Sequence, residues 1–328
     1  MDIDQIDAPS SPVLHAAIAA AERRCRPWLF ETPLEYSYAL SELCGGEVWL
    51  KLDLVQRTTS FKLRGATNKV RSLPEEAIAR GVITASTGNY ALAIAEALRP
   101  LNGRATTYVG ENITPSRLAL MEAHGLQVVP YGKEAGAAEA RARAVALEQG
   151  REYVSPYNDL EVVAGQGTCG VEIARQLPAI DTAVIAVGGG GLIAGCGEWL
   201  KGHNPQLELV GVSPAASPVM HDSMAAGRVM NPPIHATLAD TCAGGIDQDT
   251  MTLPLCARLI DRFELLSEAQ IEQGIRYLFE HHRLVAEGSA AMGVALLLAE
   301  PERFRDRCTA LVVCGRNIDL GTFRRIIG

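Results

Sequence analysis

Short runs of β-branched residues alternate with alanine-rich stretches along most of this chain. The runs predicted as strands span residues 47–53, 81–86, 104–110, 126–132, 181–189, 207–213 and 308–315, and the stretches with helical periodicity span 88–98, 138–149, 192–202 and 267–282. Strands joined by helices favour parallel sheets that helices cover, so we expect an α/β fold. No serine- or glycine-rich linker is present, so any second domain should be inserted within the first.

The composition narrows the class of protein. Of the 328 residues, 48% are hydrophobic, which is enough for a large buried core. The net charge is −8 without a run of lysine or arginine, so we expect neither nucleic acid nor a membrane as partner. The polar start MDIDQIDAPSS does not resemble a signal peptide, and no apolar stretch is long enough to span a bilayer. The eight cysteines form no C-x-x-C pair, which predicts reduced thiols in a cytoplasmic protein.

A strand followed by four glycines and a helix is predicted in AVGGGGLIAG. The glycines are Gly188, Gly189, Gly190 and Gly191. Backbone without Cβ atoms can wrap a phosphate, and the dipole of the following helix favours negative charge there. A dinucleotide site is the alternative, but the next predicted strand ends in Ser213 and not in the acid that such a site needs. A single phosphate therefore fits better, with a plain turn as the remaining alternative.

Two other predicted strand ends carry polar groups. In ASTGNYALAIA a strand ends at Ala85, and Ser86 or Thr87 can cap a helix that begins near Asn89. Free N–H groups beside hydroxyls suit a carboxylate, although an ordinary helix cap explains the same pattern. In VVCGRNID, Cys314 ends a late strand, where a thiol is by default a small core residue.

Lys62 lies in the first turn of the helix predicted in SFKLRGATNKV, with Ser60 as its expected cap. A cation is disfavoured in the first turn of a helix, so this amine has a reason to lose its proton. Taken alone, a surface lysine is the simpler interpretation. Together with a phosphate loop and a carboxylate-binding cap, the lysine indicates a Schiff base to an aldehyde that also carries a phosphate. That cofactor is pyridoxal 5′-phosphate.

The sequence resembles the threonine dehydratase and serine racemase group of pyridoxal-phosphate enzymes, which is known as fold type II. The motifs are S-F-K-x-R-G-A, S-x-G-N, the four glycines, E-G-S-A-A and the final C-G-x-N, and they extend over nearly the whole chain. TASTGN, MHDSMAAGR, LADTCAGGI and GRNID are similar to the hydroxyectoine-utilisation dehydratase branch. The resemblance implies two open α/β domains with mostly parallel sheets and the site between them. We place the large domain at residues 1–75 and 159–328 and the small inserted domain at 76–158.

The resemblance also implies a role for each matching residue. Lys62 would bind the cofactor and move the α-proton of the substrate. The other implied cofactor-binding residues are Phe61, Asn89, Gly188, Gly189, Gly190, Gly191, Glu287 and Cys314, and those implied for the substrate are Ser86, Thr87, Gly88 and Tyr90. A thiol beside the ring nitrogen is a weak donor, which favours prompt loss of a β-leaving group. The implied reaction is β-elimination from threonine or serine, giving a 2-keto acid and ammonia.

Several positions depart from the group's pattern. Thr87 stands where serine racemases carry a second catalytic serine, so racemisation is not expected as the main reaction. Tyr90 replaces a usual histidine, which leaves the substrate open among threonine, serine, phenylserine, 3-hydroxyaspartate and hydroxyectoine-derived compounds. Thr59 replaces the glycine of T-G-S-F-K. Ser213 and Val219 stand where metal-dependent relatives have acids, so we expect no metal. Relatives usually form dimers, which predicts a homodimer. A nucleotide-binding regulatory protein is the alternative from another class, and it leaves Lys62 unexplained.

Overall fold

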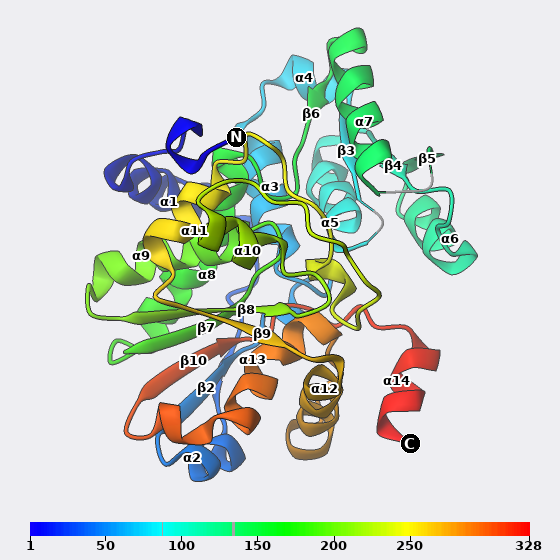
Figure 1. Cartoon of the computed structure of the whole chain (residues 1–328). Coiled ribbons are helices and arrows are strands. Elements are labelled where there is room, and N and C mark those ends of the chain that lie inside the picture. Colours follow the sequence, from blue (N-terminus) through cyan, green and yellow to red (C-terminus); the bar gives the residue numbers. More distant parts are fainter. Residues whose placement is uncertain (87, 133–134) are drawn as a thin grey trace.

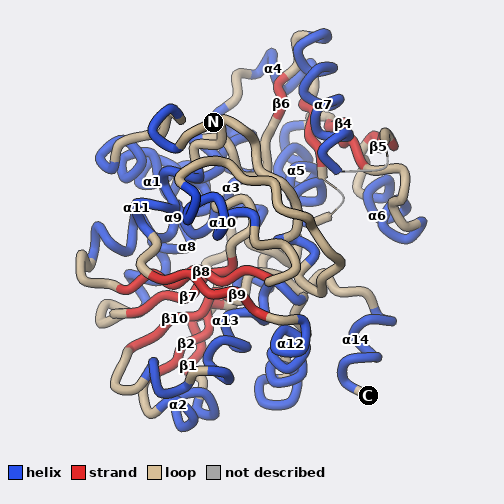
Figure 2. The backbone as a smooth tube through the Cα atoms, in the orientation of Figure 1, coloured by secondary structure: helices blue, strands red, loops and turns tan. Residues whose placement is uncertain are grey.

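The structure is a computed structural model that describes residues 1–86, 88–132 and 135–328. Its strands gather in two separate groups, which Figure 2 shows in red. The larger sheet has six strands in the order β1-β2-β10-β7-β8-β9. They span Leu34–Tyr36 (β1), Glu47–Lys51 (β2), Thr182–Ala186 (β7), Glu208–Pro214 (β8), Arg262–Leu266 (β9) and Cys308–Val312 (β10). Only the pairing of β1 with β2 is antiparallel, so the sheet is mostly parallel, as predicted.

The smaller sheet has four parallel strands in the order β5-β4-β3-β6. They span Val82–Ala85 (β3), Ala105–Val109 (β4), Gln127–Pro130 (β5) and Glu152–Tyr153 (β6). All four lie within 76–158, the range predicted for the inserted domain, while the boundaries of that domain stay a prediction. Figure 1 shows this group of strands beside the larger sheet, with α5 and α7 packed around it.

Helices cover both sheets. The longer ones span Ser11–Cys25 (α1), Tyr38–Cys44 (α2), Lys62–Ser72 (α3), Glu75–Arg80 (α4), Asn89–Leu98 (α5), Pro115–Ala123 (α6), Ala135–Gln149 (α7), Leu160–Gln176 (α8), Gly191–His203 (α9), Val219–Ala226 (α10), Thr252–Leu259 (α11), Glu268–His282 (α12), Gly288–Ala299 (α13) and Leu320–Ile327 (α14). The 3₁₀ helices span Ile3–Gln5, Arg26–Trp28, Asp53–Val55, Arg99–Leu101, Asp240–Cys242 and Pro301–Phe304. In Figure 1, α8 and α9 lie on one side of the larger sheet and α12 and α13 on the other. No described helix is long and apolar enough to cross a membrane.

Two local examples show how the sequence directs these elements. Helix α12 begins with a capping box, in which the Ser267 side chain accepts from the Gln270 backbone and the Gln270 side chain accepts from the Ser267 backbone. Strand β7 is buried over its first four residues, as a central parallel strand should be, and Ala183 and Val184 belong to the main core. The alternation of strand and helix read from the sequence is therefore confirmed, and it places several strand-to-helix junctions between the two sheets.

Candidate active site

Lys62 is the first residue of α3 and so lies in its first turn, as predicted. Its Nζ donates a hydrogen bond to the Pro156 carbonyl oxygen at 3.2 Å. The same nitrogen lies 5.0 Å from the centre of the Phe61 ring and 5.7 Å from that of the Tyr90 ring. The residue is half-buried, and loss of solvent around the amine lowers the pKa of Lys62 from 10.5 to about 8, although nearby acidic groups oppose the shift. Lys62 is therefore not an ordinary surface lysine.

Ser60 does not cap α3, so that prediction is wrong. Phe61 occupies the cap position and already has helical backbone angles. Ser60 instead forms an isolated β-bridge with Gly315, and the Phe61 N–H donates to the Cys314 carbonyl oxygen at 2.9 Å. This pairing pulls the segment away from cap geometry. The buried Ser60 hydroxyl has no hydrogen-bond partner among the described residues.

Asn89 and Glu287 meet between the two halves of the molecule. Asn89 begins α5, directly after the strand β3 of the smaller sheet, and Glu287 precedes α13, which packs on the larger sheet. The Asn89 amide donates to both Glu287 oxygens, at 3.0 and 3.1 Å. The Asn317 backbone N–H and the Thr241 hydroxyl also donate to this carboxylate, each at 3.0 Å. Burial nevertheless raises the pKa of Glu287 above its usual value.

The four glycines lie between β7 and α9, as predicted. Gly191 is the first residue of α9, a helix of 13 residues. Gly190 has φ +82°, which favours glycine. A Cβ built on Gly189 would lie 2.4 Å from the Tyr157 ring, so the backbone there approaches its neighbour too closely for any side chain. The loop thus exposes main chain at the N-terminal end of a long helix, where anions are favoured.

The residues predicted to bind the substrate surround the start of α5. The helix begins at Asn89, but Gly88 is its cap residue and no side chain caps it, so capping by Ser86 is not observed. Ser86 Oγ instead accepts from the Gly88 N–H at 3.4 Å. Tyr90 is 1% exposed, and its hydroxyl has no hydrogen-bond partner among the described residues. The prediction for Thr87 lies outside the described residues.

Cys314 lies two residues beyond β10, which ends at Val312, three residues earlier than the predicted strand 308–315. Its side chain is buried, at 3% exposure. Burial, with the nearby Glu287 carboxylate, raises the pKa of the Cys314 thiol well above its usual value. The thiol therefore stays protonated, as the weak-donor argument assumed.

Three groups near Lys62 were missing from the predicted site. Asn317 connects Glu287 to Asn89, because its side-chain N–H donates to the Asn89 oxygen while its backbone donates to Glu287. It belongs to the C-G-x-N motif, so the signal was available. Pro156 and Tyr157 come from the loop after β6 and carry no recognisable pattern in the sequence. Their contacts with Lys62 and Gly189 depend on tertiary packing alone.

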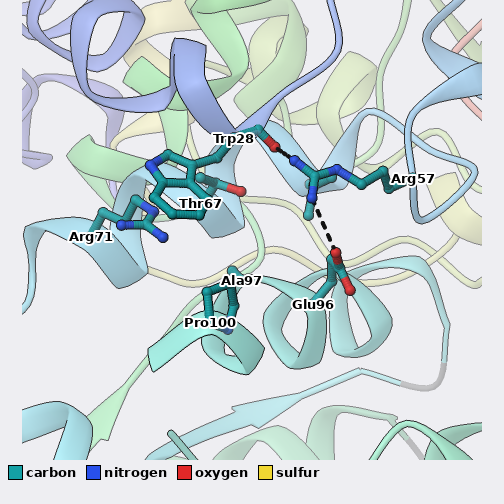
Figure 3. Close-up of a pocket in the computed structure, with 8 residues that line it drawn as sticks. Trp28, Arg57, Thr67, Arg71, Glu96, Ala97 and Pro100 are labelled. Carbon is teal, nitrogen blue, oxygen red and sulfur yellow. Dashed lines mark hydrogen bonds and ion pairs between the residues drawn. The ribbon is translucent and has the colours of Figure 1, made fainter. Parts of the chain in front are cut away.

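A surface pocket lies on another face of α3 and is not part of this site. Figure 3 shows its lining, which consists of Trp28, Arg57, Leu63, Thr67, Arg71, Glu96, Ala97 and Pro100. Arg57 crosses it to reach the Glu96 carboxylate at 3.5 Å, and the Arg71 guanidinium stacks 3.5 Å from the centre of the Trp28 ring. None of the described predicted site residues lines it.

The model of one known family, described as "Pyridoxal-phosphate dependent enzyme", matches residues 26–315. An L-threonine ammonia-lyase from Thermotoga maritima is 37% identical over 310 residues, which cover 94% of this chain and 77% of that protein. The solved structure of the processed form of threonine deaminase isoform 2 from Solanum lycopersicum superposes with a TM-score of 0.90 at 31% identity, covering 98% and 94% of the two chains. Maize serine racemase gives a TM-score of 0.88 at 27% identity, covering 95% of each.

These matches span nearly the whole chain, and the family match includes the candidate site from Phe61 to Cys314 but ends before Asn317. The two-sheet fold is thus shared with solved structures of similar enzymes, and the half-buried lysine at the start of α3 and the glycine loop at the start of α9 both lie within the residues that the family model matches. The chain belongs to the pyridoxal-phosphate-dependent enzymes, in the group of the threonine dehydratases and serine racemases.

Proposed function

We propose that this enzyme removes water from threonine or serine and releases ammonia and a 2-keto acid. The observation that carries the proposal is the Lys62 amine, which lies against the Pro156 carbonyl oxygen with its pKa lowered to about 8. About a tenth of such an amine is neutral at pH 7, against roughly 0.03% for an ordinary lysine. Relatives named as threonine ammonia-lyases and catabolic threonine dehydratases support the choice of substrate.

The residues around Lys62 fit pyridoxal 5′-phosphate. Two buried hydroxyls close to it, those of Ser60 and Tyr90, lack partners among the described residues, as expected for a site shaped around a polar molecule. The bare backbone of the glycine loop at the start of α9 suits a phosphate. When bound, this cofactor supplies an aldehyde that takes the substrate's amine and a ring that withdraws electrons from its α-carbon.

The side chains then have distinct tasks. Lys62 would hold the cofactor through Nζ, and the same nitrogen would accept the α-proton of the substrate. Gly188 to Gly191 donate backbone N–H groups to the phosphate. Asn89, at the start of α5, would place its side-chain amide beside the cofactor, and the N–H groups near Ser86 and Gly88 would receive the substrate carboxylate. Cys314, whose thiol is protonated, would leave the cofactor's ring nitrogen without a charged partner. The ring would then withdraw electrons only weakly, which favours prompt loss of the substrate's β-hydroxyl over slower reactions.

We further propose that the enzyme is a cytoplasmic homodimer with a large domain at 1–75 and 159–328 and a small one at 76–158. The reduced thiols support the cytoplasmic location, and the dimers formed by similar enzymes support the homodimer. The two separate sheets support the division into a large and a small domain. The similarity of MHDSMAAGR and LADTCAGGI to the hydroxyectoine-utilisation branch makes a hydroxyectoine-derived substrate the second candidate.

A substrate panel tests the proposal. Keto acid and ammonia are measured with threonine, serine, 3-hydroxyaspartate, phenylserine and a hydroxyectoine-derived amino acid, for the wild type, Lys62→Ala and Lys201→Ala. Lys201 is the matched control, because it lies at the end of α9 away from the glycine loop and forms a surface ion pair with Asp261. We expect threonine or serine to react and only Lys62→Ala to lose at least about 10³-fold in kcat. Ammonia release that survives in Lys62→Ala would refute the assigned role.

A further inference from the structure

Thr59, three residues before Lys62, has an unusual backbone. Its φ is +60°, in the left-handed region that β-branched residues avoid. The related motif has a glycine here, which would adopt this angle without strain. A strained residue persists only where its surroundings hold it in place. The backbone contacts of Thr59 would serve a glycine equally well, since its N–H donates to Gln56 O at 2.7 Å and its oxygen accepts from the Arg316 N–H at 3.1 Å.

The Thr59 side chain offers the contact that a glycine lacks. Its hydroxyl lies 2.6 Å from Asn317 Oδ1 and 2.6 Å from the Thr58 carbonyl oxygen, both of which can only accept, so it shares its hydrogen between them. Asn317 Nδ2 lies 3.5 Å from the same Thr58 oxygen and also reaches the oxygen of Asn89. Because a carbonyl cannot donate, the Asn317 amide must present its nitrogen to Thr58 and its oxygen to Thr59.

The orientation continues from Asn317 to Asn89. The Asn317 nitrogen donates to the Asn89 oxygen, so the Asn89 nitrogen must face the other way. It does so by donating to both oxygens of Glu287. The links from Asn317 to Thr58 and to Asn89, and from Asn89 to Glu287, each have one allowed direction. The Thr59 hydroxyl, which can donate or accept, supports that direction by donating to the Asn317 oxygen. The hydroxyl is the only link contributed by a residue that departs from the family motif.

We propose that Thr59 is a positioning residue whose hydroxyl holds the amide of Asn317, and through it the amide of Asn89, in the orientation that keeps the Asn89 oxygen on Asn317 and its N–H groups toward Glu287 and the cofactor site. This inference rests on the cofactor-binding role proposed for Asn89. Without the hydroxyl, the Asn317 oxygen loses its donor and both amides gain freedom to turn. Thr59 acts at a distance from the cofactor and takes no part in the chemistry.

Cofactor affinity in matched variants tests the proposal. Thr59→Val keeps the shape and the backbone strain but lacks the hydroxyl, Thr59→Ser keeps the hydroxyl, and Thr59→Gly removes both hydroxyl and strain. The dissociation constant for pyridoxal 5′-phosphate is measured by absorbance titration of protein freed of cofactor, alongside the melting temperature. We expect about fivefold weaker binding for Thr59→Val and Thr59→Gly and wild-type binding for Thr59→Ser. Thr59→Gly should melt no lower than the wild type although it binds the cofactor more weakly. If Thr59 only stabilised the fold, weaker binding would come with a lower melting temperature.

A double-mutant cycle with Asn317→Ala tests the route. If the hydroxyl acts through Asn317, Thr59→Val should weaken binding less than twofold in the Asn317→Ala background. Wild-type affinity in both Thr59→Val and Thr59→Gly would overturn the inference. So would a double mutant in which Thr59→Val weakens binding by the full fivefold beyond the effect of Asn317→Ala. If Thr59→Val does not fold, the comparison of Thr59→Ser with Thr59→Gly decides alone. Absence of ammonia release, by contrast, would refute the proposed function while leaving these affinities to stand.

Discussion

At the scale of single residues, burying Lys62 prepares it for chemistry at the expense of stability. Its pKa is lowered to about 8 in the folded chain against 10.5 when exposed. The unfolded chain therefore binds more protons between these values, and this residue's cost to stability is full below pH 8 and fades as the pH rises toward 10.5. In cofactor-free protein we expect Lys62→Met to raise the free energy of unfolding at pH 7 by up to about 3 kcal/mol, and by little at pH 10.5. Urea unfolding at the two pH values measures this.

Lys201→Met is the control for this experiment. Lys201 pairs with Asp261 at 2.7 Å on the surface, where such a pair contributes less than about 1 kcal/mol. Its replacement should change stability slightly and with no such trend up to pH 10.5. Equal gains for Lys62→Met at both pH values would mean that the amine is not desolvated as described.

At the scale of elements, the main chain of the glycine loop between β7 and α9 packs closely against neighbouring main chain and against the Tyr157 ring. A Cβ on Gly189 would meet the Tyr157 ring at 2.4 Å, a contact that rotamer changes cannot relieve because three ring atoms lie within 2.7 Å. We expect Gly189→Ala to shift the loop, to cost about 1–3 kcal/mol of stability and to weaken cofactor binding at least tenfold. Thermal unfolding and absorbance titration measure the two effects.

Gly125→Ala is a contrasting control for the loop. Gly125 has φ +79°, unlike Gly189, and no heavy atom within 4 Å of a built Cβ, so alanine there adds backbone strain away from the loop but no clash. A modest loss of stability with unchanged cofactor affinity is expected there. If Gly189→Ala bound the cofactor as tightly as Gly125→Ala, the loop would not be the phosphate site.

Sequence patterns predicted the elements better than their ends. The strands and helices expected from periodicity are all present, because hydrophobic pattern and length decide them. The strand β9 at the sheet edge has no fully buried residue before Leu266, so its pattern was too weak to recognise. The cap expected at Ser60 failed because a tertiary contact, its bridge to Gly315, overrides local cap preference. Ser86 does not cap α5, and Thr87, the other residue predicted as its cap, lies outside the described residues. Asn317 was quoted in a motif, but only the fold brings it to Asn89.

At the scale of the whole molecule, a buried ionic cluster holds α3 in place behind Lys62. Arg64 is fully buried and pairs with Asp53 at 2.7 Å and with Glu172 of α8 at 2.8 Å. Lys51 of β2 also reaches Glu172, at 2.7 Å, and donates to the Thr32 carbonyl oxygen. The cluster thus ties together a strand of the larger sheet, the N-terminal segment and two helices that are distant in sequence. Since Arg64 follows Lys62 by two residues, the same contacts fix the start of the catalytic helix.

Glu172 is the member of the cluster whose loss should be felt most. Burial opposes its charge, but Arg64 and Lys51 outweigh burial and hold the pKa of Glu172 well below its usual range. Its stabilisation is therefore present above about pH 4.5 and is lost as the pH falls further. We expect Glu172→Gln to lose about 3 kcal/mol of unfolding free energy at pH 7, because the buried Lys51 loses its carboxylate and Arg64 loses one of its two. The gap from the wild type should narrow between pH 5 and pH 3. Glu148→Gln breaks an exposed pair with Arg141 and should cost less than about 1 kcal/mol at every pH. Urea unfolding across this pH range distinguishes the two, and a constant gap for Glu172→Gln would show that packing, and not charge, makes this residue necessary.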